Sequence, residues 1–484
     1  MYYKKFKIIT AAASIALIAF GSSCNKIEDF GTTNANPNAV SSPVPYALLT
    51  NTEWQLGGFA SNARAAVTCQ YYSEAEYPSF GQYAVPQVDF GGTYSSILMD
   101  CQTVLNTSTS TAAEQATARI LKAYIFWTIT DRWGAIPYSQ ALKAVTPRYT
   151  KQEEIYPDLI KELTEAGAQM PNGGTQRGDI MYGVKNGVPN PNANLDWKKL
   201  ANSLRMLMAL RLSKVYPSAS GYAATQFNLA LNDAAGSIAT NEDNFQVKYP
   251  GGGADNAYSN PFYYTHLQNR DYGLSVPMFN MLASISDPRV SVYGSSSVAV
   301  PYGYSEGLIN TWRQNNPGWA RVFADGYRTI SSPIFIVTAA QTLLARAEAA
   351  DRGWTSENAN TVYTAGITAA FQQWGLAAPS AGYLSNANVA LTAPTGSGAN
   401  LKNIATQYFF ASFPDGTQGW SNWRRTGYPV LTPSPYPLST AHTTIPRRFT
   451  YGATEYSTNL AGVNEAVGWI SGGDLQESKV WWDQ

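Results

Sequence analysis

Apolar residues recur at helical spacing in long segments of this chain, and these segments alternate with irregular ones. In residues 112–133 the apolar positions follow one another at intervals of three and four, which predicts a helix with one apolar face. Gly134 and Pro137 end it, because neither residue continues a helix well. Residues 197–216 contain the run LRMLMALRL, which is apolar on nearly every face and predicts a helix buried between others.

Three helix starts are indicated by residues that favour the N-cap position. Such residues accept a hydrogen bond from the free backbone N–H groups of the first turn. The predicted N-caps are Thr150, in a capping-box pattern with Glu153, Asp196 before 197–216, and Ser332 before Pro333. Besides the two helices above, helices are predicted over residues 151–168, 222–239, 333–352, 356–374 and 401–412.

Three long segments between the helices, residues 70–95, 245–330 and 413–484, are rich in aromatic residues, glycine and proline. Loops of such length in a compact chain are usually functional. The pattern predicts a mainly α fold, with a tetratricopeptide-like helix-pair scaffold and an irregular, loop-rich second lobe, although no strict 34-residue repeat is present. The expected boundaries are about 41–245 and 331–412 for the scaffold, and about 246–330 and 413–484 for the lobe.

The N-terminus has the layout of a secretory signal. Lysines precede an apolar run, residues 8–20, which is shorter than the ~20 residues that span a bilayer. Small residues then lead to Cys24, as in a bacterial lipobox, where the cysteine is acylated and becomes the mature N-terminus. We predict a signal peptide over 1–23, a lipid-anchored tether over 24–40 and a folded region over 41–484. An ordinary signal peptide with an incidental cysteine is the alternative.

Composition narrows the classes of function. The 33 basic and 33 acidic residues balance, and no basic run exists, so nothing in the chain attracts nucleic acid. Charged residues make up only 14% of the chain, against roughly 25% in an average domain, and aromatic residues make up 13%. This balance suits an extracellular surface that binds neutral polar ligands. Cys69 and Cys101 form a disulfide or remain two buried thiols, and the sequence leaves both open.

Patterns for catalysis and cofactors are weak. His266 and His442 have no partners at metal-ligand spacing, so we expect hydrogen-bonded loop residues and neither a metal site nor a cofactor. Residues 303–307 match the G-x-S-x-G pattern of serine hydrolases, but LINTWRQNNPG after it is a poor start for the helix that this motif needs. Residues 251–256, GGGADN, lack the lysine and helix of a phosphate loop and are expected to form a turn.

Two groups of carboxylates leave other functions open. Glu74 and Glu76, among tyrosines, are the nearest candidates for a glycoside hydrolase, which needs two carboxylates about 5–10 Å apart. Hydrogen bonds to sugar hydroxyls would use the same carboxylates equally well. Residues 241–243, Asn-Glu-Asp, offer oxygen ligands for calcium, but without the spacing of an EF-hand.

Aromatic residues in the loops are the strongest candidates for ligand binding. Sugars present flat C–H faces on which Tyr and Trp rings stack, while nearby polar groups bind the hydroxyls. Most of these rings are expected to fill the core of the irregular lobe. The candidates for ligand contact are Tyr77, Tyr83, Trp312, Trp319, Glu74, Arg313 and Asn315. Expected in structural roles are the helical Trp127, Trp133, Trp197 and Trp374, and the C-terminal Arg424 and Arg425.

Several motifs together resemble the SusD/RagB family of surface nutrient-binding lipoproteins, in its SusD-like branch. ARILKAYIFWTITDRWGAIPYSQAL, LDWKKLANSLRMLMALRL and SSPIFIVTAAQTLLARAEAADRGW are similar to helices of that family. WSNWRRTGYPVL, IPRRFTYGATEYSTNLAGVNEA and GGDLQESKVWWD resemble its C-terminus. With NPNAV at residues 36–40, the matches extend in order to residue 484.

The resemblance implies four helix pairs of tetratricopeptide type and an irregular lobe. It also implies a lipoprotein of the outer membrane, facing the cell exterior, that binds oligosaccharides and delivers them to a TonB-dependent, SusC-like porin without catalysis. A peptide-binding member of the same family, a lipid-anchored glycoside hydrolase and a structural adhesin remain as alternatives.

Overall fold

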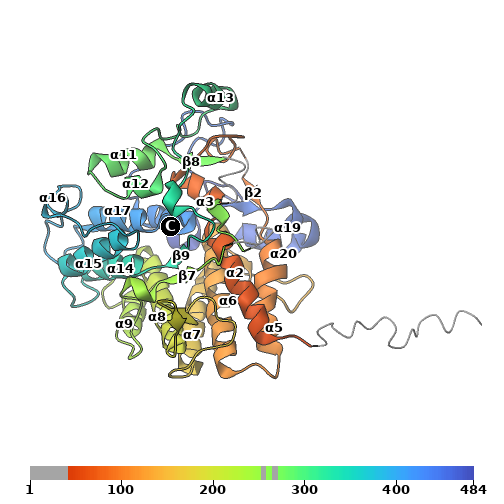
Figure 1. Cartoon of the computed structure of the whole chain (residues 1–484). Helices are drawn as coiled ribbons and strands as arrows, with labels where there is room; N and C mark the ends of the chain where they lie inside the picture. Colours follow the sequence, from red (N-terminus) through yellow and green to blue (C-terminus); the bar gives the residue numbers. More distant parts are fainter. Residues whose placement is uncertain (1–41, 85, 252–257, 264–270) are drawn as a thin grey trace, which may run out of the picture. The chain divides into compact units, whose positions relative to one another are not determined.

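The computed structural model describes residues 42–84, 86–251, 258–263 and 271–484 (Figure 1). The chain divides into an N-terminal unit, Met1–Val44, and a much larger unit, Pro45–Gln484, to which all the elements below belong. About 50% of the structure is helical and 7% is strand, which confirms the predicted mainly α fold. None of the described helices is long and apolar enough to cross a bilayer. The predicted signal peptide and the tether with Cys24 lie outside the described residues.

Helices packed in consecutive pairs form the scaffold (Figure 1). Its helices are α2 (Pro45–Ala60), α5 (Met99–Asn106), α6 (Ala112–Trp133), α7 (Gln152–Gln169), α8 (Ala193–Arg211), α9 (Tyr222–Leu231), α14 (Ala339–Asp351), α15 (Ala359–Gln372), α17 (Leu401–Ala411) and α18 (Gly416–Thr426). α6 packs on α7, α8 on α9, α14 on α15 and α17 on α18, while α7 also packs on α8 and α14 on α17. These pairs confirm the tetratricopeptide-like scaffold.

Short strands join the irregular segments to one another. The antiparallel pairs are β1 (Tyr72–Glu74) with β8 (Tyr272–Leu274), β3 (Ile136–Pro137) with β4 (Tyr149–Thr150), β5 (Val184–Lys185) with β6 (Val188–Pro189), and β7 (Phe245–Val247) with β9 (Ile334–Val337). β2 (Gln87–Val88) pairs in parallel with β10 (Thr450–Tyr451). Shorter helical elements are α3 (Ala63–Thr68), α4 (Gly91–Thr93), η3 (Tyr94–Leu98), α11 (Val276–Ser284), α12 (Val290–Tyr293), α13 (Glu306–Asn315), α19 (Ala453–Thr458), α20 (Leu460–Gly468) and η7 (Trp481–Asp483).

α6 has the predicted bounds because both of its ends are fixed locally. Thr111 accepts a hydrogen bond from the backbone N–H of Glu114, and the Glu114 carboxylate accepts one from the N–H of Thr111. At the other end, Gly134 has a φ of +90°, a conformation that favours glycine. α17 also agrees with its prediction to within one residue.

Two of the predicted N-caps are wrong. At the first position the residue belongs to a strand, and at the second the helix begins earlier than predicted. Thr150 lies in β4 and pairs with Ile136 of β3, so α7 begins only after Lys151. Asp196 lies within the first turn of α8, which begins three residues earlier at Ala193. Its carboxylate accepts a hydrogen bond from Asn190 instead of capping the helix.

The predicted N-cap at Ser332 is also wrong. Residues 334–337 form β9 against β7, so the helix α14 starts at Ala339. Thr338 and Gln341 form its capping box, with bonds of 3.2 and 2.9 Å. Two other helices are shorter than predicted, since α9 ends at Leu231 and α15 spans 359–372.

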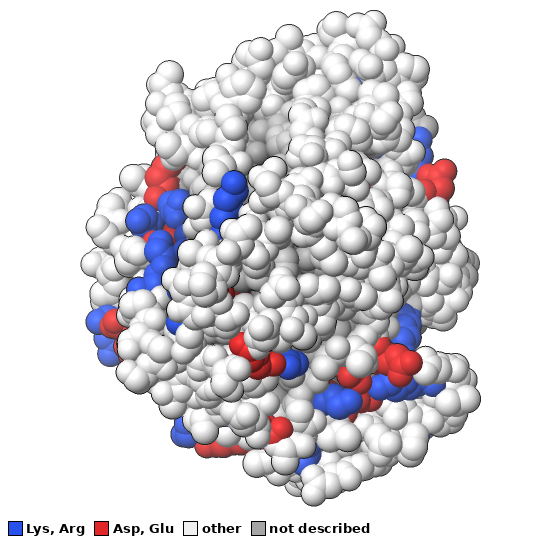
Figure 2. Space-filling model, turned by 90° about the vertical axis from the view of Figure 1, so that its left-hand side faces the viewer, with Lys and Arg blue, Asp and Glu red and all other residues white. Residues whose placement is uncertain are grey.

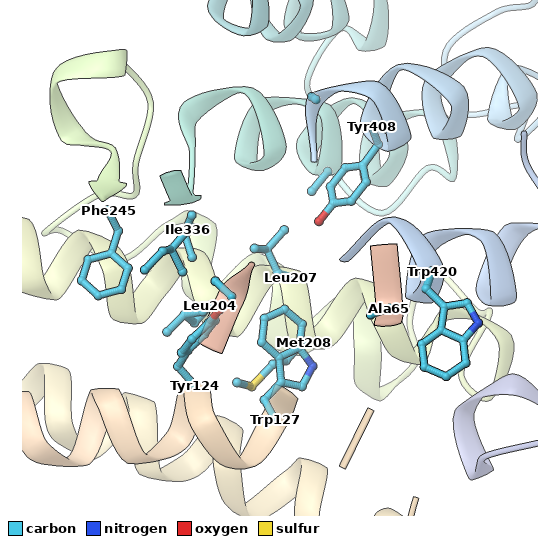
Figure 3. Close-up of a cluster of buried hydrophobic side chains, with 14 of the residues drawn as sticks. Ala65, Tyr124, Trp127, Leu204, Leu207, Met208, Phe245, Ile336, Tyr408 and Trp420 are labelled. Atoms are coloured by element: carbon cyan, nitrogen blue, oxygen red, sulfur yellow. The ribbon is translucent and has the colours of Figure 1, made fainter. Parts of the chain in front are cut away.

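A continuous apolar core lies between the scaffold helices (Figure 3). Tyr124 and Trp127 of α6, Met208 of α8 and Trp420 of α18 all contribute to it. α8 is buried along nearly its whole length, as its apolar sequence predicts. The expected core positions of Trp127, Trp133, Trp197 and Trp374 are confirmed, since all four are buried.

A buried carboxylate joins the ends of four elements to α6. Asp131 is fully buried, and its Oδ1 accepts hydrogen bonds from the Tyr156 hydroxyl of α7 and from the Trp482 indole of η7. Its Oδ2 accepts a bond of 3.4 Å from Ser421 of α18 and lies 3.5 Å from Nε of Arg211 in α8. Because a buried carboxylate is costly without such partners, these contacts hold the four elements together.

Two arginines of α18 extend this network, which confirms the structural role expected for both. Arg424 donates to the backbone carbonyl of Asp131 at 2.8 Å and lies 3.9 Å above the Trp420 ring. Burial lowers the pKa of Arg424 to about 9. Arg425 forms a bidentate ion pair with the buried Glu348 of α14.

Cys69 and Cys101 are free thiols, so the alternative of a disulfide is excluded. Both are fully buried, and burial raises the pKa of each, to about 12 for Cys101. A thiol that stays protonated is a poor nucleophile and metal ligand. Both cysteines therefore serve as small apolar core residues.

α18 approaches α3 closely because two of its residues are glycines. A Cβ atom on Gly416 would lie 2.1 Å from the backbone nitrogen of Ala66. A Cβ atom on Gly419 would lie 2.3 Å from the Tyr71 hydroxyl oxygen. A side chain can move aside more easily than backbone can. The contact with Ala66 therefore makes a side chain at Gly416 less tolerable than one at Gly419.

We expect Gly416→Ala to destabilise the protein by about 1–3 kcal/mol or more, because the added methyl group overpacks against backbone. Gly58→Ala is the matched control. Gly58 is exposed in α2 and a Cβ there meets no atom within 4 Å, so alanine should stabilise the helix by about 0.5–1 kcal/mol. Chemical denaturation followed by circular dichroism measures both. Equal stability of the two variants would contradict the packing described.

The ion pair of Glu348 predicts a pH dependence of stability. Burial acts to raise the pKa of Glu348, but Arg425 and Arg352 lower it from 4.5 to about 2. In Glu348→Gln, Arg425 keeps a buried charge without its partner, so we expect a loss of about 3–5 kcal/mol at neutral pH. The stabilisation needs the ionised carboxylate. It is therefore complete above pH 4.5 and lost as the pH falls towards 2.

The measurement is the difference in unfolding free energy between wild type and Glu348→Gln at several pH values. This difference should shrink as the solution is acidified through that interval. Glu242→Gln, at an exposed position, should differ little from wild type throughout. A difference for Glu348→Gln that does not change with pH would rule out the ion pair as its cause.

Candidate functional site

Glu74 holds the loop that follows β1. Its carboxylate accepts hydrogen bonds of 2.9–3.1 Å from the backbone N–H groups of Ser79, Phe80 and Gly81. Burial raises the pKa of Glu74, and these N–H groups act against the rise. The closed loop presents Tyr77 at its tip, with a φ of 53° in the left-handed region.

α13 lies against this loop, although the two are far apart in the sequence. Arg313 pairs with Glu76 at 2.6 Å and donates to the Ala75 carbonyl at 2.9 Å. A small buried cluster forms the base of this contact and contains Ala75, Val300, Ile309 and Trp319. The structure thus brings together the two segments from which the sequence candidates were drawn.

The predicted aromatic residues differ in how open their rings are. Tyr77 is 77% exposed, and Trp312 is half-buried. Tyr83 and Trp319 are 2% and 7% exposed, so their ring faces are covered by protein. The Tyr83 hydroxyl accepts a hydrogen bond of 2.9 Å from the backbone of Ser434. Tyr83 and Trp319 therefore pack beneath the surface and support the loop after β1 and helix α13.

The open rings around α13 form a surface that we call the α13 face. It consists of Tyr77, Tyr304, Trp312 and Tyr436, with the polar Arg313 and the exposed Asn315. Tyr304 and Tyr436 meet edge to face at 5.7 Å. Tyr436 was not singled out by the sequence, because only the folded chain brings its proline-rich segment beside α13.

The possible catalytic groups are engaged in structural contacts. Ser305 occupies the N-cap position of α13, although its hydroxyl makes no capping hydrogen bond, so the expectation that LINTWRQNNPG is a poor helix start is wrong. Of the two histidines, His442 has its Nδ1 2.9 Å from a Glu477 oxygen, whereas His266 lies outside the described residues. Glu74 binds backbone and Glu76 pairs with Arg313.

Lysine side chains lie where a calcium ion would bind residues 241–243. Asp243 Oδ1 is 2.9 Å from Nζ of Lys199 and 3.1 Å from Nζ of Lys185. Burial acts to raise the pKa of Asp243, but the two lysines lower it. Within the described ranges, no three His, Cys, Asp or Glu side chains are grouped to hold a metal. The predicted turn at 251–256 is described only at Gly251.

A concave pocket of about 520 Å³, which we call the Trp54 pocket, lies beside α2. Its aromatic lining consists of Trp54, Phe59, Phe90 and Tyr249. The rings of Trp54 and Tyr249 are 5.0 Å apart, and the exposed Tyr258 lies 5.3 Å from Trp54. This volume falls within the usual range of small-molecule sites, about 300–1,000 Å³.

The polar lining of the Trp54 pocket is largely uncharged. It consists of Gln55, Thr93, Ser96 and Ser259, and Asp89 adds one carboxylate. The Ser259 hydroxyl is buried and has no hydrogen-bond partner among the described residues. Part of the wall is η3, a π-helix, an element often found at functional sites. The sequence did not reveal this pocket, because it predicted no helix over residues 45–60 and did not single out Trp54.

Charge is sparse on the upper part of the molecule as seen in Figure 2. The charged side chains on that face lie at middle height on both sides and in the lower part. Between Tyr272 and Ala320, the segment that carries α11, α12 and α13, the charged residues are Asp287, Arg289, Glu306 and Arg313. The first two form a fully buried ion pair at 2.6 Å, and Arg313 is paired with Glu76. Such a surface favours neutral polar ligands over ions.

Comparison with known proteins identifies relatives of this chain. Residues 37–452 match the SusD-like family described as starch-binding and associating with the outer membrane. The chain is similar in structure to a chitin-binding SusD homolog from Flavobacterium johnsoniae, with 25% identity and a TM-score of 0.78 over 91% of this chain and 98% of that one. No curated protein is similar enough in sequence to count as a relative.

Two further structures show the same architecture over the same share of this chain. A chitin-binding protein has 27% identity and a TM-score of 0.74, with 91% of this chain and 100% of that one covered. A SusD homolog from Bacteroides uniformis has 24% identity and a TM-score of 0.77, with 91% and 98% covered. The family match and the shared helix-pair architecture lead to one conclusion: this chain belongs to the SusD-like family.

Proposed function

We propose that this protein is a surface lipoprotein that binds oligosaccharides and delivers them, unaltered, to a TonB-dependent, SusC-like porin of the outer membrane. The observation that carries the proposal is the Trp54 pocket. Its partly exposed rings, Trp54 and Phe59, suit the C–H faces of sugars, and its uncharged polar groups suit their hydroxyls. Family membership and the chitin-binding relatives make oligosaccharides of glucose and of N-acetylglucosamine the first ligands to test.

Trp54, in the lining of the pocket, and Tyr258, 5.3 Å from it, are the proposed stacking platform. Trp54 is held by its edge-to-face contact with Tyr249, so little side-chain freedom is lost when a sugar binds. The unpartnered Ser259 hydroxyl and the carboxylate of Asp89 are the proposed hydrogen-bonding groups. A ligand hydroxyl would satisfy the Ser259 hydroxyl, which has no hydrogen-bond partner among the described residues.

The α13 face is a second proposed contact surface for the glycan. Tyr77 and Trp312 would stack on sugar rings, and Arg313 and Asn315 would bind hydroxyls. Glu74, Tyr83 and Trp319 would contribute by keeping the loop and α13 in position.

Binding without catalysis is supported by the state of the two candidate carboxylates. A glycoside hydrolase needs one protonated acid and one free carboxylate facing the same sugar. The Glu74 oxygens accept three backbone hydrogen bonds, and Glu76 is paired with Arg313. Neither group is free for proton transfer or nucleophilic attack in this arrangement.

We expect Trp54→Ala to weaken oligosaccharide binding about 10–100-fold, since burying an aromatic ring contributes about 1.5–3 kcal/mol. Isothermal titration calorimetry with starch and chitin fragments measures the affinity, and chromatography of the recovered sugar tests for cleavage. Leu229→Ala is the matched control, because Leu229 is 55% exposed and does not line the Trp54 pocket.

Other outcomes of the same titration are equally informative. If Tyr77→Ala or Trp312→Ala lost binding and Trp54→Ala did not, the binding site would be assigned to the α13 face instead of the Trp54 pocket. Cleaved sugar would contradict the non-catalytic role, and Glu74→Gln would then be the next variant. Saturable binding of peptides, without binding of oligosaccharides, would show that the cargo is a peptide.

The proposed lipid anchor makes a separate prediction about location. Cys24→Ala removes the acylated thiol, so the protein should move from the membrane fraction to the soluble fraction of cells, because the acyl chains supply the membrane affinity. Immunoblots of the two fractions, with Ser23→Ala as control, measure this. Retention of Cys24→Ala in the membrane would contradict anchoring through this cysteine.

A further inference from the structure

A second pocket, of about 390 Å³, lies where the C-terminal segment meets the ends of α6 and α7. Its walls come from residues 133–135 after α6, residues 151–153 at the start of α7, and C-terminal residues between 448 and 484. We call it the Trp469 pocket. It shares no lining residue with the Trp54 pocket.

The outer wall of the Trp469 pocket is aromatic. Trp469, directly after α20, is 37% exposed, and Trp481 of η7 and Ile470 extend the apolar surface. Lys151 Nζ lies 5.5 Å from the Trp469 ring. An open indole face beside a cation favours a ligand that has both a flat apolar side and a negative group.

The floor of the Trp469 pocket contains a buried arginine with an unused donor. Arg448 is fully buried, its Nε donates to the Trp133 carbonyl at 3.1 Å and its Nη1 pairs with Asp474. Its Nη2 has no hydrogen-bond partner among the described residues. Beside it, Gln152 is 3% exposed and its Oε1 is also without a partner.

The polar lining of the Trp469 pocket contains more cations than carboxylates. Lys151, Lys479 and Arg448 contribute three cationic groups. Lys151 Nζ lies 3.6 Å from Glu153 and Arg448 is paired with Asp474, so Lys479 is the lining cation without an ion pair among the described residues. The pocket also faces the first turn of the 18-residue helix α7, whose N-cap residue Lys151 makes no side-chain capping hydrogen bond. The N-terminus of a long helix carries a partial positive charge and favours anions.

We propose that the Trp469 pocket binds a sugar acid, a hexuronate unit, at a site separate from the one for neutral oligosaccharides. The C–H face of the ring stacks on Trp469, and the carboxylate lies among Lys151, Lys479 and the start of α7. Nη2 of Arg448 is buried, so it does not bind the carboxylate directly. The positive charge of the guanidinium attracts the carboxylate from beneath the pocket floor. The proposal rests on the proposed function only in taking the ligand to be a sugar.

The test is a titration of the purified protein with glucuronate, followed by ligand-observed NMR, with glucose as the neutral match. We expect saturable glucuronate binding that is at least about tenfold tighter than glucose binding, because only glucuronate carries the charge. Its affinity should fall as sodium chloride is added. Trp469→Ala and Lys479→Ala should each weaken it about tenfold. Both replaced side chains are exposed, so the variants should fold, which melting curves verify.

The control variant is Leu229→Ala, at an exposed position of α9 that lines neither pocket, and it should bind glucuronate as wild type does. Trp54→Ala tests whether the sugar acid uses the other pocket. Equal affinity for glucose and glucuronate would overturn the proposal, and so would glucuronate binding that Trp469→Ala leaves unchanged. Loss of glucuronate binding in Trp54→Ala would also overturn it, by assigning the sugar acid to the other pocket. Titration with neutral oligosaccharides tests only the proposed function, and titration with glucuronate tests only the Trp469 pocket. Either proposal can therefore fail without the other.

Discussion

The buried carboxylate of Asp131 is the constraint on which the rest of the structure depends. A carboxylate inside a helical core is tolerated only when donors and cations surround it. Here the donors come from positions 156, 211, 421 and 482, on α7, α8, α18 and η7. The C-terminal segment must therefore return to the scaffold before the site at the end of α6 is complete. This explains why a chain with so much irregular structure has a defined fold.

The return of the C-terminal segment also creates the surfaces that can bind ligands. α18 fits against α3 because Gly416 and Gly419 lack side chains, and α3 leads directly into β1 and the loop held by Glu74. β10 pairs with β2, just before η3 and the wall of the Trp54 pocket. Each pocket is therefore built from segments that are remote in sequence and are fixed by buried polar contacts rather than by long strands.

The arrangement of charge separates structural from binding roles. Most charged side chains named above act in pairs, such as Glu348 with Arg425 and Asp287 with Arg289, and these pairs are buried between elements. The surfaces around α13 and Trp54 have partly exposed rings and mostly uncharged polar groups instead, with Arg313 and Asp89 as their charged residues. The Trp469 pocket differs because its cations line a cavity. A neutral glycan and a sugar acid would thus be recognised by different physical means on one protein.

The sequence by itself determined the class of fold and most scaffold helices, but not α2, α5 or α18, because helical periodicity is a local property that is clearest in long segments. It also indicated the structural roles of Arg424 and Arg425 and the two loops that meet at Arg313. Tertiary structure decided the rest. Strand pairing moved the predicted helix starts at Thr150 and Ser332, and burial closed the rings of Tyr83 and Trp319. The Trp54 pocket could not be predicted, since an exposed and a buried face of a helix look alike in sequence until the partners that cover one of them are known.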